Sequence, residues 1–126
     1  MGYEIEFYET ENGKVPVAEF IQSLADKFSA KMLRDIDLLK DFGPKLHFPY
    51  VDSIKGDKYK NLMELRTKQG SNIFRTFYFI VIKDSKTKVD TAVLLHAIQK
   101  KTPKTPKKEL DTAMVRMKDF ILRGQK

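Results

Sequence analysis

The sequence contains no cysteine and no tryptophan, and it has only two histidines among its 126 residues. Without cysteine, disulfides and thiolate chemistry are excluded, and two histidines are too few for the usual zinc sites. The chain also lacks an aspartate cluster of the kind that holds Mg²⁺, a glycine-rich phosphate loop, a dinucleotide fingerprint and a nucleophile elbow. We therefore expect a protein that works without a metal or an organic cofactor.

No apolar run reaches the roughly 18 residues that a membrane-spanning helix needs. The chain begins with the acidic stretch MGYEIEFYE, which is unlike the basic and apolar segments of a secretory signal. Glu6 stands where a lipid anchor at Gly2 would require Ser or Thr. We expect no contact with a membrane, and the cytoplasm is the default location.

Positive charge is in excess, because 24 Lys and Arg against 17 Asp and Glu give a formal net charge of +7. The charge is unevenly distributed: residues 1–13 contain four glutamates and no basic residue, whereas five lysines fall between Lys100 and Lys108. The hydrophobic fraction of 41% is that of a globular chain, and the length fits one domain over residues 1–126. One positive side, suited to nucleic acid or an acidic partner, is therefore expected.

Periodicity predicts the first half of the fold. Alternating apolar and polar residues predict a strand over residues 3–7. Apolar residues at helical spacing then predict a helix over residues 16–28 and a second helix that is capped by Ser29 and stopped by Gly43 and Pro44. Residues 44–59 are expected to be irregular.

The second half is predicted to contain three antiparallel strands and a helix. The strands are expected over residues 60–68, 72–83 and 89–98, with hairpin connections at 69–71 and 84–88. A C-terminal helix follows, with Thr105 as its N-cap and Pro106 as its first residue. The predicted class is α+β: a strand, a two-helix hairpin, three antiparallel strands and a C-terminal helix.

Charged residues interrupt these apolar strands. Glu64 and Arg66 are two residues apart, so they share one face of their strand, and Arg75 lies in the most apolar strand of the chain. His96 lies near the end of the last strand. Hairpin pairing can bring Arg66, Arg75 and His96 to one surface of the sheet, although the sequence leaves the register open.

Each of these residues also has a structural interpretation. Glu64 and Arg66 can form a solvated ion pair, and Arg75 can be a structural arginine whose guanidinium pairs with Glu64. His96 can be a hydrogen-bonded histidine without a chemical role. His47, in the irregular segment, is interpreted as structural or incidental.

The lysine run can be a solvated surface, but its position argues for a binding role. If the last helix begins at Pro106, Lys107 and Lys108 occupy its first turn, where cations are unfavourable by roughly 0.3–1 kcal/mol each. An arriving anion would remove this penalty, because exposed N–H groups and lysines together bind phosphate. We therefore expect the run to bind anions through the following residues: Lys100, Lys101, Lys104, Lys107 and Lys108.

Arginine, lysine, histidine and tyrosine together suit the cleavage of RNA without a metal. The ribose 2′-OH attacks the adjacent phosphate after a base removes its proton, arginine stabilises the growing charge, and an acid protonates the 5′-oxygen. Crowded lysines disfavour one another's protonation, so one of them can have a lowered pKa and act as the base. DNA lacks the 2′-OH and would not be cut in this way.

Four segments of the chain resemble a known family: PVAEFIQSL, LMELR, NIFRTFYFI and, most specifically, LLHAIQKKTPKTPKKELDTA. Over nearly its whole length the chain resembles the HigB-type, phage-related branch of the RelE/ParE toxin superfamily. The resemblance implies a RelE-like, microbial-ribonuclease-like fold, ribosome-dependent cleavage of mRNA, and a cognate antitoxin with a helix-turn-helix domain. Met63 stands where the family often has Trp, a difference that affects packing more than chemistry.

The resemblance also matches individual residues. Arg66 and Arg75 are expected to stabilise the scissile phosphate, and His96 is an acid/base candidate because its ordinary pKa of about 6.5 suits both roles. Lys104 and Lys107 are expected to hold flanking phosphate or ribosomal RNA, with one of them a candidate for proton transfer. Lys100, Lys101 and Lys108 are expected to bind RNA phosphates.

Two other functions stay open at this point. The superfamily divides into RNA cleavers and gyrase poisons, so a non-enzymatic gyrase inhibitor or RNA-binding module is the second hypothesis. A phage structural or accessory protein is the third. The basic residues match the RNA-cleaving side better.

Overall fold

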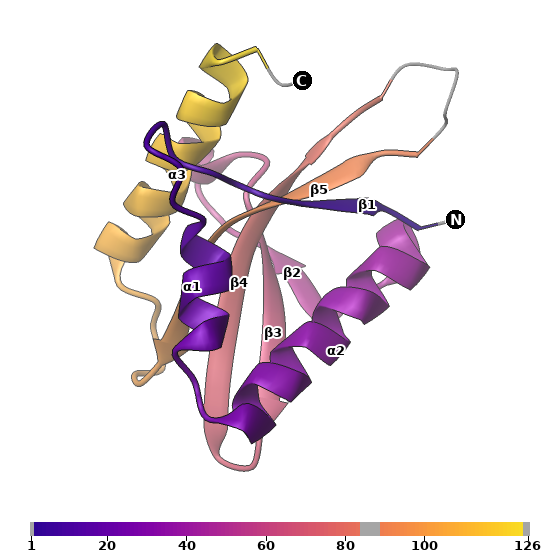
Figure 1. Cartoon of the computed structure of the whole chain (residues 1–126), viewed down its shortest axis with the longest axis vertical. Coiled ribbons are helices and arrows are strands. Elements are labelled where there is room, and N and C mark those ends of the chain that lie inside the picture. Colours follow the sequence, from indigo (N-terminus) through magenta and orange to yellow (C-terminus); the bar gives the residue numbers. More distant parts are fainter. Residues whose placement is uncertain (1, 84–88, 125–126) are drawn as a thin grey trace.

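The computed structural model describes residues 2–83 and 89–124. Within these residues the chain forms one five-stranded mixed sheet with helices on both faces (Figure 1). The helices and strands are β1 (Glu4–Phe7), α1 (Pro16–Gln22), α2 (Asp26–Phe42), β2 (Val51–Ser53), β3 (Met63–Gln69), β4 (Asn72–Val81), β5 (Thr91–Lys100) and α3 (Lys107–Leu122), with short 3₁₀ turns η1 (Gly43–Lys45) and η2 (Asp57–Tyr59).

The strand order is β1-β5-β4-β3-β2. Strands β3, β4 and β5 pair antiparallel, as predicted, whereas β1 lies parallel beside β5 at one edge. The predicted α+β class with a C-terminal helix is confirmed. The tight turn between β3 and β4 pairs Gln69 with Asn72, and Gly70 adopts a φ of 63°, a conformation that glycine tolerates.

Each face of the sheet has its own core. Helices α1 and α2 cover one face, where the buried residues include Val17, Met32, Leu39, Leu65, Phe74, Tyr78 and Leu94. Helix α3 covers the other face, where Phe77, Phe79, Val93, Leu95, Ala113 and Met117 are buried. This second face also carries the charged residues that interrupt the strands.

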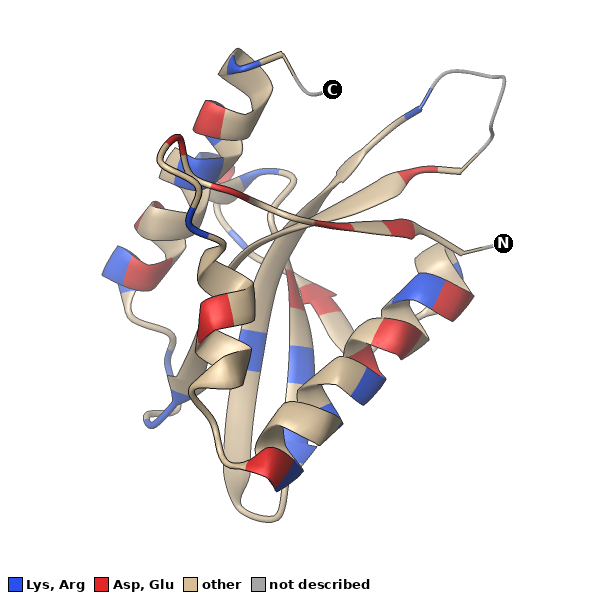
Figure 2. Ribbon diagram, viewed as in Figure 1, with Lys and Arg blue, Asp and Glu red and all other residues tan. Residues whose placement is uncertain are grey.

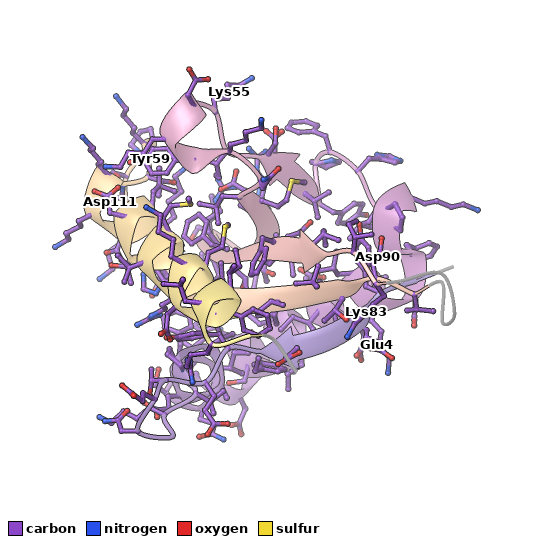
Figure 3. The ribbon with its side chains drawn as sticks, turned by 90° about the horizontal axis from the view of Figure 1, so that it is seen from above. Glu4, Lys55, Tyr59, Lys83, Asp90 and Asp111 are labelled. Atoms are coloured by element: carbon purple, nitrogen blue, oxygen red, sulfur yellow. The ribbon has the colours of Figure 1, made fainter. Side chains whose placement is uncertain are left out.

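Two contacts of the Asp111 carboxylate attach α3 to the turn η2. The Tyr59 hydroxyl in η2 donates to Asp111 Oδ1 in α3 at 2.9 Å, and the two side chains point toward each other in Figure 3. Lys58 Nζ lies 3.0 Å from the same carboxylate oxygen. Helix α3 is thereby fixed at its N-terminal end to the segment that leads into β3.

A β-bulge in β5 decides which way His96 points. Phe77 pairs with His96 and Tyr78 with Leu94, so Leu95 is an extra residue in the ladder. Leu95 and His96 therefore both lie on the α3 face, where Leu95 joins the core and the His96 ring stacks on Phe77. Regular alternation would have placed His96 on the opposite face from Leu95.

The predicted boundary between the first two helices is wrong. Helix α1 ends at Gln22 and α2 begins at Asp26, so Phe28 belongs to the second helix. The apolar spacing continues across the turn because Leu24 and Phe28 both pack against the same core. Ser29 is not an N-cap: its hydroxyl lies inside α2 and donates to the Ile21 carbonyl at 2.6 Å, which joins the two helices.

Two further expectations about boundaries need correction. The segment 44–59 is not wholly irregular, since β2 pairs with β3 at the sheet edge. Helix α3 begins at Lys107, with Pro106 rather than Thr105 at the N-cap and no side-chain cap. The predicted connection 84–88 lies outside the described residues. Among the described residues, no helix is long and apolar enough to cross a membrane.

Candidate phosphate-binding site

Arg66 and Arg75 are cross-strand partners on β3 and β4, so their side chains leave the same face of the sheet. In Figure 2, Lys and Arg positions lie side by side on these two strands. Between them lies Glu64, whose Oε2 is 3.1 Å from both Arg66 Nε and Arg66 Nη2 and 3.5 Å from Arg75 Nη1. Asp52 on β2 adds a second contact to Arg66 at 3.3 Å.

Glu64 is only 6% exposed, so the solvated ion pair considered from the sequence is not what forms. Instead a buried carboxylate is shared by two guanidinium groups. One negative charge cannot neutralise two positive charges, and Asp52 contacts only the outer arginine, Arg66. The positive charge of Arg75 is therefore less well neutralised than that of Arg66.

Arg75 has unused hydrogen-bonding capacity in a buried position. The residue is 8% exposed, and its Nε and Nη1 are buried without a hydrogen-bond partner among the described residues. A buried donor without a partner destabilises a fold by about 1–3 kcal/mol. Burial lowers the pKa of Arg75, and the charge of Arg66 adds to this effect while Glu64 opposes it. An anion with several acceptor oxygens would satisfy the free N–H groups.

Two adjacent cavities give access to Arg75, and together we call them the arginine groove. The first has a volume of about 260 Å³ and is lined by Lys31, Asp35, Pro49, Tyr50, Arg66, Thr67, Lys68, Ile73 and Arg75. The second has a volume of about 330 Å³ and is lined by Ser71, Ile73, Arg75, Lys100, Lys101, Thr102 and Pro103. Arg75 and Ile73 line both cavities, so Arg75 lies at the centre of a basic groove.

The structure divides the five lysines of the basic run. Lys100 and Lys101 line the groove beside Arg75. Lys104 is exposed and lines neither cavity; its carbonyl accepts a 2.7 Å hydrogen bond from the hydroxyl of Thr102. Lys107 and Lys108 lie in the exposed first turn of α3, as the sequence predicted despite the shifted helix start.

Among the lysines that the structure describes, Lys100 is the one whose pKa is lowered. Burial is the largest cause of the lowered pKa. The positive charges of Arg75 and Arg66 lower it further, whereas the negative charge of Glu64 raises it. The sequence predicted one lysine with a lowered pKa but ascribed this to crowding among lysines. The structure ascribes it to burial beside an arginine, which the lysine run alone does not indicate.

His96 lies on the same sheet face as Arg75, but both of its ring nitrogens are engaged by α3. Nε2 lies 2.6 Å from Glu109 Oε1, and Nδ1 lies 3.0 Å from Arg116 Nη1. Arginine only donates, so Nδ1 carries the lone pair and Nε2–H donates to Glu109. Burial lowers the pKa of His96, which favours this neutral ring. The structural interpretation of His96 therefore has direct geometric support.

His47 is exposed, and its Nδ1 lies 2.8 Å from the carbonyl of the next residue, in agreement with the structural or incidental role expected for it. Among the described residues, no group of three or more His, Asp or Glu is arranged to hold a metal ion.

Asp35, Lys31 and Tyr50 line the groove although the sequence did not single them out. Asp35 is 2% exposed and pairs with Lys31 at 2.9 Å. One signal for it was present: Asp35 lies within the apolar stripe that contains Met32 and Leu39, and an acid at such a position needs a partner. Tyr50 comes from a segment without periodicity, which offered no comparable signal.

Residues 19–118, from α1 to α3, match the family described as phage-derived protein Gp49-like (DUF891). This is a RelE/HigB-like toxin family, and the α+β fold with its mixed sheet is consistent with the RelE-like fold. None of the curated proteins matches the chain. The chain belongs to the Gp49-like family of phage-derived, toxin-like proteins.

Proposed function

We propose that this protein is the toxin of a type II toxin–antitoxin system, of the HigB-type branch, and that it cleaves mRNA on the ribosome. The observation that carries the proposal is Arg75, a buried guanidinium whose Nε and Nη1 make no hydrogen bond among the described residues, although Nη1 has the 3.5 Å ion pair with Glu64. Arg75 lies at the centre of a groove that also presents Arg66, Lys100 and Lys101. Such a group is prepared to receive the oxygens of a phosphodiester.

In the proposed reaction the ribose 2′-oxygen attacks phosphorus and the bond from phosphorus to the 5′-oxygen breaks. Arg75 and Arg66 donate hydrogen bonds to the non-bridging oxygens, where negative charge grows in the transition state. Glu64 keeps both guanidinium groups oriented before the substrate arrives. The products are a 2′,3′-cyclic phosphate and a free 5′-OH.

Two protons move in this reaction. Lys100 is the best candidate for accepting the proton of the 2′-OH, because its lowered pKa gives it a larger neutral fraction than an ordinary lysine and it lines the groove with Arg75. Lys101 lines the same cavity and can protonate the departing 5′-oxygen. His96 can take part only if α3 releases its ring from Glu109 and Arg116. Lys104 lies outside the groove and suits flanking phosphate or ribosomal RNA.

The lysines outside the groove support the ribosomal part of the proposal. Lys104, Lys107 and Lys108 are exposed and line neither cavity of the groove, so their positive charge is available to a partner other than the substrate in the groove. Ribosomal RNA offers a dense array of phosphates for such residues. The ribosome would also position the mRNA, which a groove with few acid/base groups needs.

A non-enzymatic RNA-binding or gyrase-inhibiting role is the second candidate, and one observation favours it. Both ring nitrogens of His96 already have partners in α3. The described residues that line the groove include arginines and lysines but no histidine, so no imidazole is available there as an acid or a base. A binding module needs no acid or base. The two roles differ in whether RNA is cut.

The deciding experiment uses ribosomes programmed with a defined mRNA and the purified protein in excess. We expect cleavage in the ribosome-bound codon, products ending in 2′,3′-cyclic phosphate and 5′-OH, and no cleavage when the 2′-OH of that nucleotide is replaced by hydrogen. Free mRNA should be cut weakly or not at all. Intact mRNA combined with inhibited gyrase supercoiling would reject the nuclease and support the second candidate.

The antitoxin is part of the proposal. Expression of this chain alone should arrest growth, and co-expression with a helix-turn-helix protein encoded beside it should restore growth. Normal growth at a high level of folded protein would contradict a toxin role.

A further inference from the structure

A short segment between η1 and β2 presents two aromatic rings next to the arginine groove. The Tyr50 N–H donates to the His47 carbonyl at 2.9 Å, and the Arg66 N–H donates to the Tyr50 carbonyl at 2.7 Å. The second bond attaches the segment directly to β3. The rings of Phe48 and Tyr50 are therefore carried by a backbone that is fixed beside the groove.

Both rings are exposed, although most aromatic residues of this protein are buried in the two cores or packed against them. Phe48 is 62% exposed and Tyr50 is 44% exposed. The Phe48 ring lies 5.0 Å from the guanidinium carbon of Arg66, and Tyr50 lines the first cavity together with Arg66 and Arg75. Single exposed apolar residues are common, but two rings beside two arginines form a surface on which a flat, electron-rich ligand can stack.

The first cavity also contains buried polar groups that the phosphate site does not use. Asp35 and Lys31 form a 2.9 Å ion pair on α2, in which the carboxylate is 2% exposed. The Thr67 hydroxyl is buried without a hydrogen-bond partner among the described residues. The residues that line the cavity thus supply one aromatic ring, a fixed acceptor, a fixed donor and a hydroxyl without a partner, together with Arg66 and Arg75.

We propose that this cavity binds the nucleobase of the nucleotide that carries the scissile phosphate, with the base stacked on Tyr50 and its edge bonded by Asp35, Lys31 and Thr67. Phe48 does not line the cavity but adjoins it through Arg66, and its ring extends the stacking surface. The identity of the ligand as single-stranded RNA rests on the proposed function. A base and a phosphate are joined through one ribose, so a base site must share a wall with the phosphate site, as this cavity does. Stacking on aromatic side chains is how unpaired bases are bound in proteins generally.

The Asp35–Lys31 pair also makes the site selective. Adenine and cytosine present an amino donor beside a ring-nitrogen acceptor, whereas guanine and uracil present a carbonyl acceptor beside a ring N–H donor. For a base that stacks in one orientation, a fixed carboxylate next to a fixed ammonium matches only one of these two orders. We therefore expect one position of the cleaved codon to separate amino bases from keto bases.

The test compares four variants: Tyr50→Leu, Phe48→Leu, Asp35→Asn and, as a matched control, Phe42→Leu. Phe42 is 50% exposed and lines neither cavity of the groove, so its loss removes an exposed ring without touching the site. Binding is measured with a short single-stranded RNA that contains 2-aminopurine, whose fluorescence is quenched by stacking. Melting temperatures establish that each variant is folded.

We expect wild type and Phe42→Leu to quench the probe, and Tyr50→Leu and Phe48→Leu to bind roughly 5-fold to 100-fold more weakly, the range for loss of one stacked base. Unchanged binding and quenching in folded Tyr50→Leu and Phe48→Leu would overturn the proposal. On ribosomes, sequenced cleavage ends should show an amino-against-keto preference that Asp35→Asn reduces at least several-fold. Equal use of all four bases by wild type would equally overturn it.

These outcomes separate the base site from the nuclease. Ring-dependent binding without any RNA cleavage would retain the base site and reject the nuclease proposal. Cleavage that is insensitive to both ring variants and to Asp35→Asn would retain the nuclease and reject the base site.

Discussion

Arg66 and Arg75 lie directly opposite each other on β3 and β4 and contact the same carboxylate oxygen of Glu64. Like charges opposite each other destabilise a sheet, and Glu64 offsets this repulsion for both. The arrangement keeps two guanidinium groups close together while leaving Arg75 with unpartnered donors. A structure optimised only for stability would have no reason to retain the second arginine.

The first prediction separates catalysis from stability at Arg75. In Arg75→Ala, Arg66 still compensates Glu64, so we expect a folded protein whose melting temperature changes by only a few degrees. The single-turnover cleavage rate on ribosomes should fall roughly 100-fold or more, because the missing donors act on the transition state. Arg75→Lys, which keeps the charge but loses the planar fork, should recover only part of the rate. A folded Arg75→Ala with full activity would exclude Arg75 from the site, and a variant that does not fold would make it structural.

The second prediction concerns the shared carboxylate. Glu64→Gln leaves two opposed arginines without their common partner and should lower the free energy of unfolding by about 3 kcal/mol. Adding Arg75→Met to Glu64→Gln should restore part of this loss, since one of the two charges is gone. Urea denaturation of the two single variants and the double variant gives the coupling energy. Strictly additive effects would show that Glu64 and Arg75 do not interact.

The third prediction distinguishes the lysines inside the groove from those outside it. Each of Lys100→Ala, Lys101→Ala, Lys104→Ala and Lys108→Ala should weaken RNA binding modestly and reduce the slope of log affinity against log salt by about one unit for each phosphate that the lysine neutralises. Only the first two should also lower the cleavage rate at saturation. Lys118→Ala, an exposed lysine of α3, is the control and should leave both quantities unchanged. Equal losses of cleavage rate in Lys100→Ala and Lys104→Ala would argue against different roles for the lysines inside and outside the groove.

The fourth prediction is a dependence of cleavage on pH. Lys100 acts as a base only when neutral, and its pKa is lowered from the ordinary 10.5 by burial and by Arg75. The single-turnover rate should therefore rise as the pH is raised from about 6.5 toward that lowered pKa. Lys100→Arg keeps the charge but cannot lose its proton, so the remaining rate should show no such rise. A pH profile of Lys100→Arg identical to that of wild type would remove Lys100 as the base.

The fifth prediction concerns the stability of the contact between α3 and the sheet. Burial lowers the pKa of His96 from the ordinary 6.5, with Arg116 adding to the effect and Glu109 opposing it. As the pH falls below 6.5, His96 binds a proton in the unfolded chain, whereas in the folded protein it stays neutral until a lower pH. The free energy of unfolding should therefore decrease over this window, by at most about 1.4 kcal/mol per pH unit for one proton.

His96→Gln removes the titrating ring and should flatten this decrease between about pH 7.5 and 5.5, above the range where carboxylates titrate. His47→Gln is the matched control, because His47 is exposed in a different segment. An unchanged slope in His96→Gln would show that the decrease comes from other groups.

The sequence by itself determined the types of the elements other than β2, although it misplaced the boundary between α1 and α2. Apolar spacing is a local property, so the helices, the strands β3 to β5 and the shared face of Glu64 and Arg66 followed directly from it. The pairing of Arg66 with Arg75 across β3 and β4 depends on one further fact, the length of the turn. A two-residue turn at Gly70 and Ser71 fixes the register that places the two arginines opposite each other.

Only the tertiary structure decided which of these residues meet. The bulge at Leu95 turns His96 onto the α3 face, and α3 then occupies both of its ring nitrogens. The end of β5 brings Lys100 against Arg75, whereas Lys104 lies just beyond the groove. Asp35 and Tyr50 line the groove although they are far from Arg75 in the sequence. The position of the bulge and the packing of α3 depend on the helices that cover the two faces of the sheet. These helices are distant in sequence, so no local sequence pattern predicts their effect.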